Sequence, residues 1–479
     1  MDVTELDRLL PWIDGADHPV DGVEPLLDPF SGAAVALVGG ADEAAVEAAV
    51  TAASNARAAM AAMPVHERAH LLRVAADRLE PRAEEFAVQV TRSTGKVLKH
   101  TRREAGRAPW TLRAAAAAAE APGPALPPAD AMPGGEGVLA TASRFPVGVV
   151  AAITPFNAPI NLVLHKIAPA LAMGNCIVVK PAPEAPWPAV ELARLLTDVG
   201  FPPGAVNVIP GDVNAGKHLV ADPRVALITF TGGTVAGLAV RAAAGLRPVL
   251  LELGGNSANI VHGDADLELA VEQCLLGGFS NNGQSCNSVQ RILVHRSRFE
   301  RFTAALVEAA GRLRVGSPMD PNTDIGPLVR ASSAERVQKN LDLAVAAGAT
   351  VHLGGQRQGA VVPPTIVSDV PRDSPLYVQE AFAPLVITEP YDEIDDAIEG
   401  ANDTPFALQA AVFTRSSHVM TRCFQGLRAG SVIVNRSSNF RLDQLPYGGI
   451  GSSGWGREGP LYAALEMTYL KSLVIAPSR

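Results

Sequence analysis

One cysteine of this chain has surroundings that favour reactivity. Cys286 lies in the polar stretch NNGQSCNSVQ, residues 281–290, between an apolar run and a strand-like one. The other cysteines, at positions 176, 274 and 423, lie in apolar or helix-like segments and are expected to be buried. A core thiol seldom has such polar neighbours, and a thiolate is a strong nucleophile. We therefore predict that Cys286 reacts.

A carboxylate and an amide could assist such a nucleophile. Glu252 is embedded in LLELGG, residues 250–255, where burial among leucines would raise its pKa and make it a proton acceptor near neutral pH. A structural salt bridge is the alternative. Asn157, in TPFNAP, could join the Cys286 backbone N–H in donating to an oxyanion. Its alternative is a helix cap, which the local sequence favours.

Two further segments could hold a dinucleotide. FTGGTVAG, residues 230–237, closes a strand and opens a helix, so its glycines would let backbone N–H groups meet a pyrophosphate. A tight turn is the alternative, and no Gly-Lys-Ser/Thr follows to make a P-loop. Lys180, in VVKPAPEAP, ends an apolar strand, where it is either a ligand of ribose or phosphate or a surface lysine.

The combination indicates aldehyde oxidation. A thiolate would add to the carbonyl and form a thiohemiacetal, and hydride would then leave to a nicotinamide and give a thioester. A water activated by the carboxylate would release the acid.

Alternating strands and helices would position these groups. Strands are predicted at 147–154, 176–180, 206–211, 226–232 and 248–255, with helices at 159–173, 187–199, 215–221 and 235–244. Apolar strands alternating with helices indicate a parallel, doubly wound sheet, which binds ligands beyond the carboxyl ends of its strands.

A second α/β series follows the first. Its predicted helices are 266–279, 299–312, 333–347, 394–401 and 417–426, and its predicted strands are 291–295, 384–389, 408–413 and 431–434. Before the first sheet, residues 1–40 look irregular and 41–120 read as amphipathic helices. The Pro- and Gly-rich run 122–137 reads as a linker or extended arm, and 466–475 as a final extended segment.

Composition bounds the class of protein. The 479 residues suggest two or three domains, and 48% hydrophobic against 19% charged residues fits a soluble globular protein. A net charge of -9 without a basic stripe argues against nucleic acid as a partner. The acidic N-terminus and the lack of a long apolar run argue against secretion and a membrane span. Four scattered cysteines predict no metal site and a reducing, cytoplasmic setting.

The chain resembles the aldehyde dehydrogenase superfamily over essentially its whole length. The landmarks TPFN, KPAPEAP, FTGGT, LELGG, GQSC, QEAFAP, PYGG and SGWGREG occur in the family's order. The resemblance implies Cys286 as nucleophile, Glu252 as general base and Asn157 as oxyanion donor. It implies NAD(P) binding by Thr154, Pro155, Phe156, Lys180, Pro181, Ala182, Glu184, Gly211, Gly216, Phe230, Thr231, Gly232, Gly233, Thr234, Leu253, Gly254, Glu380 and Phe382. Among these, Lys180 would contact the adenine ribose, Glu380 the nicotinamide ribose and Phe382 the ring.

The family also implies an architecture. We expect an α/β fold with two doubly wound domains and a β-arm for oligomerisation. The cofactor domain would span 1–121 and 143–251, the catalytic domain 252–435, and the arm 122–142 and 436–479. Homodimers or homotetramers are then expected.

Some positions depart from the commoner pattern. Where the family often has a Glu that bonds the ribose 2′-hydroxyl, this chain has Pro183, and Glu184 follows. Because no Arg or Lys lies between 181 and 193 to meet a 2′-phosphate, we expect NAD as cofactor, with NADP as the alternative. Gly233, Asn256 and Ala383 also differ from the usual residues without removing a reacting group. The presence of Glu252 argues against the acyl-CoA-forming branch.

The substrate is suggested by a likeness to the lactaldehyde and phosphonoacetaldehyde dehydrogenase branch. QRILVH, PINLVLHKIAPALA and DQLPYGG carry this likeness and imply a short, polar or anionic aldehyde. The residues expected to face it are Arg107, Trp110, Ser285, Asn287 and Arg441. A catalytically idle relative is the competing interpretation, and the joint presence of nucleophile, base and oxyanion donor speaks against it.

Overall fold

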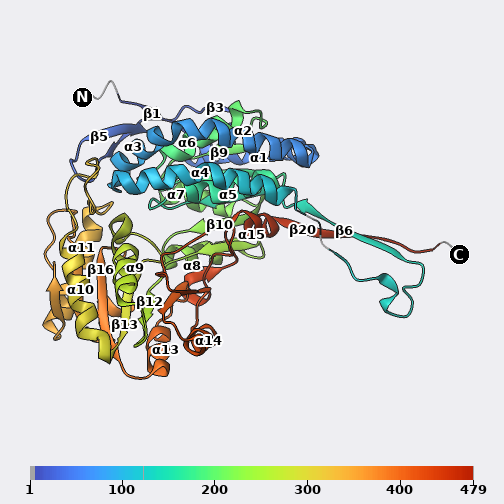
Figure 1. Cartoon of the computed structure of the whole chain (residues 1–479). Helices are drawn as coiled ribbons and strands as arrows, with labels where there is room; N and C mark the ends of the chain where they lie inside the picture. The colour runs from blue at the N-terminus through green and yellow to red at the C-terminus, as the bar shows by residue number, and fades with distance from the viewer. Residues whose placement is uncertain (1–5, 122, 124, 478–479) are drawn as a thin grey trace.

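Two α/β bodies and a projecting two-stranded arm make up the chain in the computed structural model, which describes residues 6–121, 123 and 125–477 (Figure 1). The termini 1–5 and 478–479 and residues 122 and 124, which fall in the predicted cofactor domain and arm, lie outside the described residues. Within that described part, no helix is long and apolar enough to cross a membrane.

The first body is built on an eight-stranded sheet of order β19-β11-β10-β7-β8-β9-β2-β3. Its parallel centre confirms the predicted strands: β7 (Val149–Ile153), β8 (Cys176–Lys180), β9 (Val206–Val208), β10 (Val225–Thr231) and β11 (Val249–Glu252). Its antiparallel edges were not predicted, because two-residue strands carry no periodicity: β2 (Trp12–Ile13), β3 (Ala16–Asp17) and β19 (Gly454–Trp455).

Helices cover this sheet, and α4 packs against α2, α3 and α5. Their bounds are α1 (Glu43–Ala62), α2 (Val65–Leu79), α3 (Ala83–Thr94), α4 (Leu98–Ala119), α5 (Asn161–Ala172), α6 (Trp187–Asp198), α7 (Val213–Ala221) and α8 (Thr234–Ala244). The expectation that 1–40 is irregular was wrong. This region contributes β2 and β3 and a small sheet of order β1-β5-β4, from β1 (Arg8–Leu9), β5 (Ala34–Val38) and β4 (Glu24–Leu27).

The second body is a seven-stranded sheet of order β14-β15-β16-β13-β12-β17-β18. The strands β13 (Val289–His295), β16 (Leu385–Tyr391), β17 (Gln409–Phe413) and β18 (Ser431–Val434) were predicted, whereas β12 (Ser257–Val261), β14 (Thr350–Leu353) and β15 (Thr365–Ser368) were not. Its helices are α9 (Leu267–Phe279), α10 (Phe299–Gly311), α11 (Ala331–Ala346), α12 (Pro375–Val378), α13 (Ile394–Asn402) and α14 (Ser417–Gly426). Three apolar clusters are buried against this sheet.

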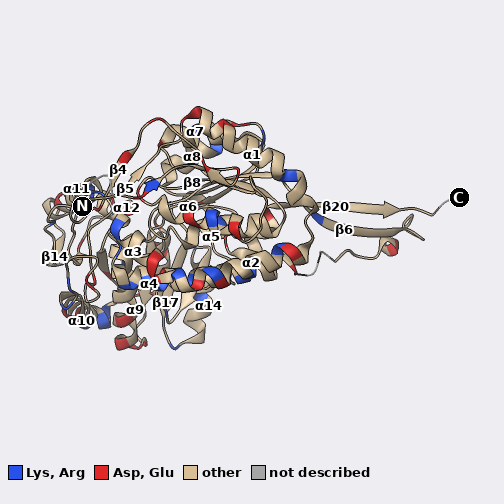
Figure 2. Cartoon of the chain, turned by 90° about the horizontal axis from the view of Figure 1, so that it is seen from above, with Lys and Arg blue, Asp and Glu red and all other residues tan. Residues whose placement is uncertain are grey.

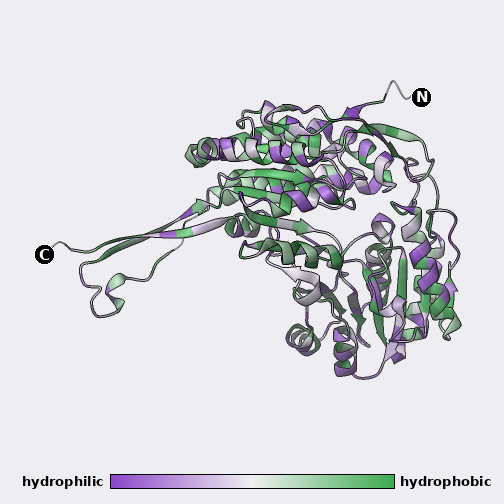
Figure 3. Ribbon diagram, turned by 180° about the vertical axis from the view of Figure 1, so that it is seen from behind, coloured by the Kyte–Doolittle hydropathy of each residue, from purple (hydrophilic) through white to green (hydrophobic). Residues whose placement is uncertain are grey.

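The arm pairs β6 (Leu139–Pro146) with β20 (Thr468–Ile475) in antiparallel register, from Pro146 opposite Thr468 to Leu139 opposite Ile475. It extends away from both bodies in each view (Figures 1 and 3). Figure 2 shows few charged residues along its strands. The short helix α15 (Pro460–Glu466) precedes β20 and packs on α4 and α5.

The chain crosses from the first sheet to the second within a few residues. β11 ends at Glu252 and β12 begins at Ser257, so the segment 253–256 links the two sheets. Cys286 precedes β13, the neighbour of β12. The carboxyl ends of the first sheet and the amino end of β13 therefore meet at this crossing.

Candidate active site

The loop that carries Cys286 has an unusual backbone. After α9 the chain forms a 3-10 turn in which Asn281 and Asn282 have φ of 53° and 54°. Gly283 follows at φ 68°, and a Cβ there would lie 2.0 Å from the Ala383 carbonyl oxygen. Asn tolerates the left-handed region better than most residues, and the close approach at Gly283 requires glycine. The sequence Asn-Asn-Gly therefore builds the turn that presents Cys286.

Cys286 is half-buried, and its Sγ lies 3.0 Å from the hydroxyl oxygen of Tyr447. Burial raises the pKa of the thiol to about 12, while the hydrogen bond from Tyr447 and the nearby Arg441 oppose the rise. The thiol is therefore protonated near neutral pH until a proton acceptor or a bound ligand changes its surroundings.

The side chain of Asn157 contacts Gln284, two residues before the cysteine in the sequence. Its Nδ2 donates to the Gln284 carbonyl at 3.0 Å, which also receives Asn281 Nδ2 at 3.0 Å. The helix-cap alternative is wrong, because α5 begins at Asn161 and its cap position is Ile160. The amide group of Asn157 has a second N–H that this contact leaves free to donate.

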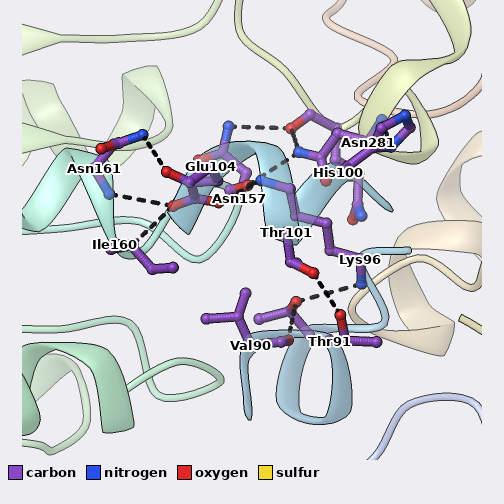
Figure 4. A network of polar contacts seen from close by, with 12 residues as sticks. Val90, Thr91, Lys96, His100, Thr101, Glu104, Asn157, Ile160, Asn161 and Asn281 are labelled. Carbon is purple, nitrogen blue, oxygen red and sulfur yellow. Dashed lines mark hydrogen bonds and ion pairs between the residues drawn. The ribbon is translucent and has the colours of Figure 1, made fainter. Parts of the chain in front are cut away.

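A buried ion pair holds the segment that carries Asn157 (Figure 4). Lys96 Nζ pairs with the Glu104 carboxylate and donates to the Asn157 carbonyl at 3.0 Å. The second carboxylate oxygen of Glu104 accepts the backbone N–H groups of Ile160 at 2.8 Å and Asn161 at 3.2 Å, at the start of α5. A carboxylate at a helix N-terminus is electrostatically favourable, so this contact fixes both the helix and the preceding loop.

Glu252 is buried at the carboxyl end of β11, and its Oε2 has no hydrogen-bond partner. Burial, and then the charge of Glu458, raise the pKa of Glu252 well above its ordinary value, against Arg441 and Lys166. Among the described residues Glu252 forms no ion pair, so the salt-bridge alternative lacks support. A carboxyl group with a raised pKa and a free oxygen suits proton transfer near neutrality.

A cluster of buried charges adjoins Glu252 and Cys286. Arg441 donates to Glu458 at 2.9 Å and lies over the Tyr447 ring, 4.0 Å from its centroid. Lys166 Nζ lies 3.7 Å from Glu458 and donates to Thr229 at 3.0 Å.

A second carboxylate in this cluster, Asp443, pairs with Arg107 at 2.7 Å and lies 3.3 Å from His165 Nε2. Two buried nitrogens, His165 Nδ1 and Arg441 Nε, have no hydrogen-bond partner among the described residues, although Arg441 Nε lies 3.8 Å from Asp443. Unsatisfied buried polar atoms are costly, and they fit a site that receives a polar or anionic ligand.

The carboxyl edge of the first sheet has the features of a dinucleotide site. The hydroxyls of Thr154 and Thr231, beyond β7 and at the end of β10, are buried without a partner. α8 begins directly after Gly233, and a Cβ at Gly237 would come 2.4 Å from Leu253. The other predicted cofactor residues occupy the same edge: Pro155, Phe156, Lys180, Pro181, Ala182, Gly211, Gly216, Phe230, Gly232 and Thr234. Free hydroxyls beside a helix N-terminus fit a pyrophosphate-bearing cofactor.

A cation distant in sequence reaches this edge. Arg330 forms an ion pair with Glu184, and both act on the buried ammonium of Lys180. No Arg or Lys lies between 181 and 193, but folding brings Arg330 to this edge from a distant part of the sequence. The expectation of NAD rested on the absence of a cation that could meet a 2′-phosphate, and Arg330 is such a cation.

Glu380 and Phe382 lie at the crossing between the sheets. Burial raises the pKa of Glu380 to about 7, against the hydrogen bond that Gly255 N–H donates to it at 2.9 Å. A Cβ at Gly254 would lie 2.6 Å from Glu380 Oε2. Phe382 has φ of 52°, a strained value for this residue, and its ring meets Phe156 edge to face at 5.9 Å. Strain of this kind is concentrated at functional sites.

Comparison with known proteins places this site in a family. The model of the aldehyde dehydrogenase family matches residues 15–473. The chain belongs to the aldehyde dehydrogenase family. It is 45% identical over 411 residues to the 3-sulfolactaldehyde dehydrogenase of Priestia megaterium, covering 86% of each chain. It is 37% identical to the sulfoacetaldehyde dehydrogenase of Neptuniibacter caesariensis, covering 85% and 90%, and 35% identical to the lactaldehyde dehydrogenase of Methanocaldococcus jannaschii, covering 97% and 98%.

Solved aldehyde dehydrogenases share the whole fold. Aldehyde dehydrogenase 21 from Physcomitrella patens, in complex with the reaction product succinate, is 33% identical with a TM-score of 0.95 and 98% coverage of each chain. GapN from Methanocaldococcus jannaschii, complexed with NADP, is 35% identical with a TM-score of 0.92 and coverage of 96% and 100%. PnpE in complex with nicotinamide adenine dinucleotide is 33% identical with a TM-score of 0.93 and coverage of 98% and 97%. The expected fold and the lactaldehyde-like branch are therefore confirmed, in an NAD(P)-dependent family.

The expected substrate residues do not all meet at the aldehyde dehydrogenase site. Arg107 and Arg441 join the charged cluster, and Ser285 adjoins the cysteine. Asn287 is committed to Gln409 and Asn439. Trp110 is 66% exposed, with Arg113 over its ring, and the structure does not bring it to the cluster.

Several polar residues of the site were missed from the sequence: His165, Lys166, Tyr447 and Glu458. All lie inside motifs that the resemblance used, PINLVLHK, PYGG and GREG, so their polarity was the available signal.

Proposed function

We propose that this aldehyde dehydrogenase oxidises a small anionic aldehyde to the carboxylic acid, with Cys286 as nucleophile, Glu252 as general base and Asn157 as oxyanion donor. The observation that carries the proposal is the meeting of these three residues at the crossing between the two sheets. The family gives the reaction type, and the residue roles are our inference.

The chain's own groups act in sequence. The Cys286 thiolate attacks the carbonyl carbon, and the resulting oxyanion accepts hydrogen bonds from the Cys286 N–H and the free N–H of Asn157. The nicotinamide, when bound, supplies the acceptor for the hydride that leaves this carbon. A thioester then remains on Cys286. Ionised Glu252 takes a proton from the water that attacks the thioester, and the thiolate leaves as the acid forms.

The cofactor would lie along the carboxyl edge of the first sheet. The start of α8 and the hydroxyls of Thr154 and Thr231 suit its phosphates, and Lys180 and Glu184 suit a ribose. Glu380 and Phe382 would hold the nicotinamide end. Because a carboxylate at the ribose accepts from a 2′-hydroxyl and repels a 2′-phosphate, Glu184 favours NAD over NADP, and Arg330 tempers this preference.

The substrate's anionic group would face the charged cluster. Arg441 Nε, and His165 Nδ1 when it carries the proton, are buried donors without a hydrogen bond, and Arg107 adds a partly exposed cation. The names of the 3-sulfolactaldehyde and sulfoacetaldehyde dehydrogenases support a sulfonate-bearing aldehyde of two or three carbons. A guanidinium suits such planar or tetrahedral oxyanions.

We further propose the domain division given by the resemblance, with 1–121 and 143–251 binding cofactor, 252–435 carrying the cysteine, and 122–142 with 436–479 serving assembly. β20 leaves Leu470, Leu473 and Val474 exposed, and an isolated two-stranded ribbon is only marginally stable. Both facts favour burial of the arm against another copy in a homodimer or homotetramer. The free cysteines fit a reducing cytoplasm.

An aldehyde panel tests the function. Purified enzyme is given 3-sulfolactaldehyde, sulfoacetaldehyde, lactaldehyde, phosphonoacetaldehyde or propanal, with NAD or NADP, and absorbance is followed at 340 nm. We expect the anionic aldehydes to be preferred and Cys286→Ala to abolish turnover. Full turnover by this variant, or no reduced cofactor with any aldehyde despite dinucleotide binding, would overturn the proposal. Product formation that requires added coenzyme A would instead identify an acylating enzyme.

A further inference from the structure

Tyr447 reaches the nucleophile from the C-terminal part of the chain. It is buried in PYGG, and its backbone pairs with that of Glu458, with Tyr447 N–H donating at 3.0 Å. Its hydroxyl oxygen lies 3.0 Å from Cys286 Sγ. No other described residue hydrogen-bonds to this sulfur through a side chain or backbone group. The contact therefore singles out one hydroxyl as the immediate partner of the reacting atom.

Arg441 fixes the position of this hydroxyl. Its guanidinium lies 4.0 Å from the centroid of the Tyr447 ring, at cation–π distance, and its Nη2 is bonded to Glu458 at 2.9 Å. Glu458 is in turn close to Lys166, 3.7 Å away. The Tyr447 ring therefore packs against a buried guanidinium that is itself held by Glu458, and this packing limits the rotation of the ring.

The hydroxyl is a donor toward a thiolate. Burial, and the neighbouring Cys286, raise the pKa of Tyr447 well above its ordinary value, so the phenol keeps its proton over the working range of an enzyme. The other charged groups that face the sulfur are Glu380 and Glu252, which disfavour the thiolate, and Arg441, which favours it. Among the neutral groups in contact with the sulfur, Tyr447 is thus the one that lowers the cost of its negative charge.

We propose that Tyr447 is a catalytic residue that donates its hydroxyl hydrogen bond to the Cys286 thiolate. This inference rests on the proposed role of Cys286. The hydrogen bond stabilises the sulfur before it attacks the aldehyde. It acts again when the carbon–sulfur bond of the thioester breaks and its electron pair returns to sulfur. Tyr447 keeps its proton throughout, and the proton of the Cys286 thiol leaves to a base, for which ionised Glu252 is the proposed acceptor.

The test measures the thiolate itself in the enzyme without cofactor. Alkylation of Cys286 by iodoacetamide is followed from pH 6 to pH 11, below the pKa of the buried thiol, where the rate is proportional to the thiolate fraction and so reports a shift in that pKa; the modified peptide is quantified by mass spectrometry. Tyr447→Phe keeps the ring under Arg441 and removes the hydroxyl. A hydrogen bond to a charged group is worth roughly one to two pKa units. The apparent pKa of alkylation should rise by that amount, with roughly ten- to a hundredfold slower alkylation at neutral pH.

Tyr391→Phe is the matched control. Its hydroxyl is also buried in the second body and bonded to His262 at 2.9 Å, but it lies at the opposite end of β13 from Cys286. This variant should retain the wild-type alkylation profile. An unchanged profile in Tyr447→Phe would overturn the inference. The role of Cys286 is judged separately by the turnover of Cys286→Ala, so the two failures are distinguishable.

A second measurement does not depend on how Tyr447→Phe folds. Biosynthetic replacement of the five tyrosines by 3-fluorotyrosine keeps every hydroxyl but makes it more acidic and therefore a stronger donor. The apparent pKa of Cys286 alkylation should then fall, and the same replacement in Tyr391→Phe should give the same fall. A pKa that stays constant or rises would contradict donation by Tyr447.

Discussion

The Lys96 ammonium and the Glu104 carboxylate form an almost wholly buried ion pair at the amino end of α4. Both partners also bind the segment before α5, Lys96 at the Asn157 carbonyl and Glu104 at the Ile160 N–H. The pair thereby joins the helical layer of the first body to the loop that holds Asn157, the proposed oxyanion donor. Neither residue would touch the substrate, so we regard both as positioning residues.

Replacing one member of this pair should destabilise the enzyme. Glu104→Gln leaves the Lys96 ammonium buried without a counter-charge, and breaking a buried pair in this way costs about 3–5 kcal/mol. The free energy of unfolding, measured by urea titration of the assembled enzyme, should fall by that order. Lys96→Met in the same background removes the unpaired charge and should recover part of the loss.

Arg102→Gln is the control for this prediction. Arg102 lies on the same helix and pairs with Glu84, but both side chains are exposed. Water already solvates these charges, so the substitution should change stability little. If Glu104→Gln and Arg102→Gln lowered the free energy of unfolding equally, burial of the Lys96–Glu104 pair would not contribute to stability.

The parallel strands and main helices could be predicted from the sequence because their apolar patterns are local. β12 was missed because only 253–256 separate it from β11, so the two strands read as one run. The short strands at 1–40 depend on pairing with distant partners, such as Trp12 with Val208, and leave no local pattern.

The site divides in the same way. Cys286 and Glu252 stood out because their polarity conflicts with their neighbours in sequence. Tyr447 is 161 residues from the cysteine that it contacts, and Arg330 is 146 residues from Glu184. Only the folded chain brings these pairs together, and a single sequence carries no signal of a contact.

Turnover should rise with pH as Glu252 loses its proton. Burial and the charge of Glu458 raise the pKa of Glu252, and only the ionised carboxylate can accept a proton from water. The rate at saturating substrate should therefore climb through and above neutrality. Glu252→Gln should lower kcat by roughly 10²- to 10⁴-fold yet still give a burst of about one equivalent of reduced cofactor, measured by stopped flow.

Glu458→Gln should move this rising limb to lower pH. The substitution removes the negative charge that disfavours ionisation of Glu252 and leaves Lys166 and Arg441 to favour it. A limb that stays in place, or moves to higher pH, would argue that another group controls turnover.

Arg107 should select for the substrate's charge. It faces Asp443 in the cluster, whereas Arg113 on the same helix stacks on Trp110 and pairs with Asp77. Arg107→Gln should raise KM for an anionic aldehyde roughly ten- to a hundredfold, the value of a charge-assisted hydrogen bond, and leave that for propanal unchanged. Arg113→Gln should alter neither, and steady-state kinetics with both substrates decides between a substrate-binding and a structural role.

Glu184 should control the choice between the two dinucleotides. Glu184→Ser removes the carboxylate that would repel a 2′-phosphate and leaves Arg330 and Lys180 to attract it. The ratio of kcat/KM for NADP over NAD should rise roughly ten- to a hundredfold. Adding Arg330→Gln should abolish most of that gain, and retention of the full gain would place the 2′-phosphate away from Arg330.

The arm should determine the assembly state. Leu470 and Val474 lie on one face of β20, since side chains two residues apart in a strand point the same way, and both are more than half exposed. Leu470→Glu with Val474→Glu should give a smaller particle by light scattering after gel filtration, because two charges replace apolar surface that another copy would bury. Leu343→Glu, at an exposed leucine of α11 remote from the arm, is the control and should leave the mass unchanged. An arm variant of wild-type mass would mean that β20 faces water in the native assembly.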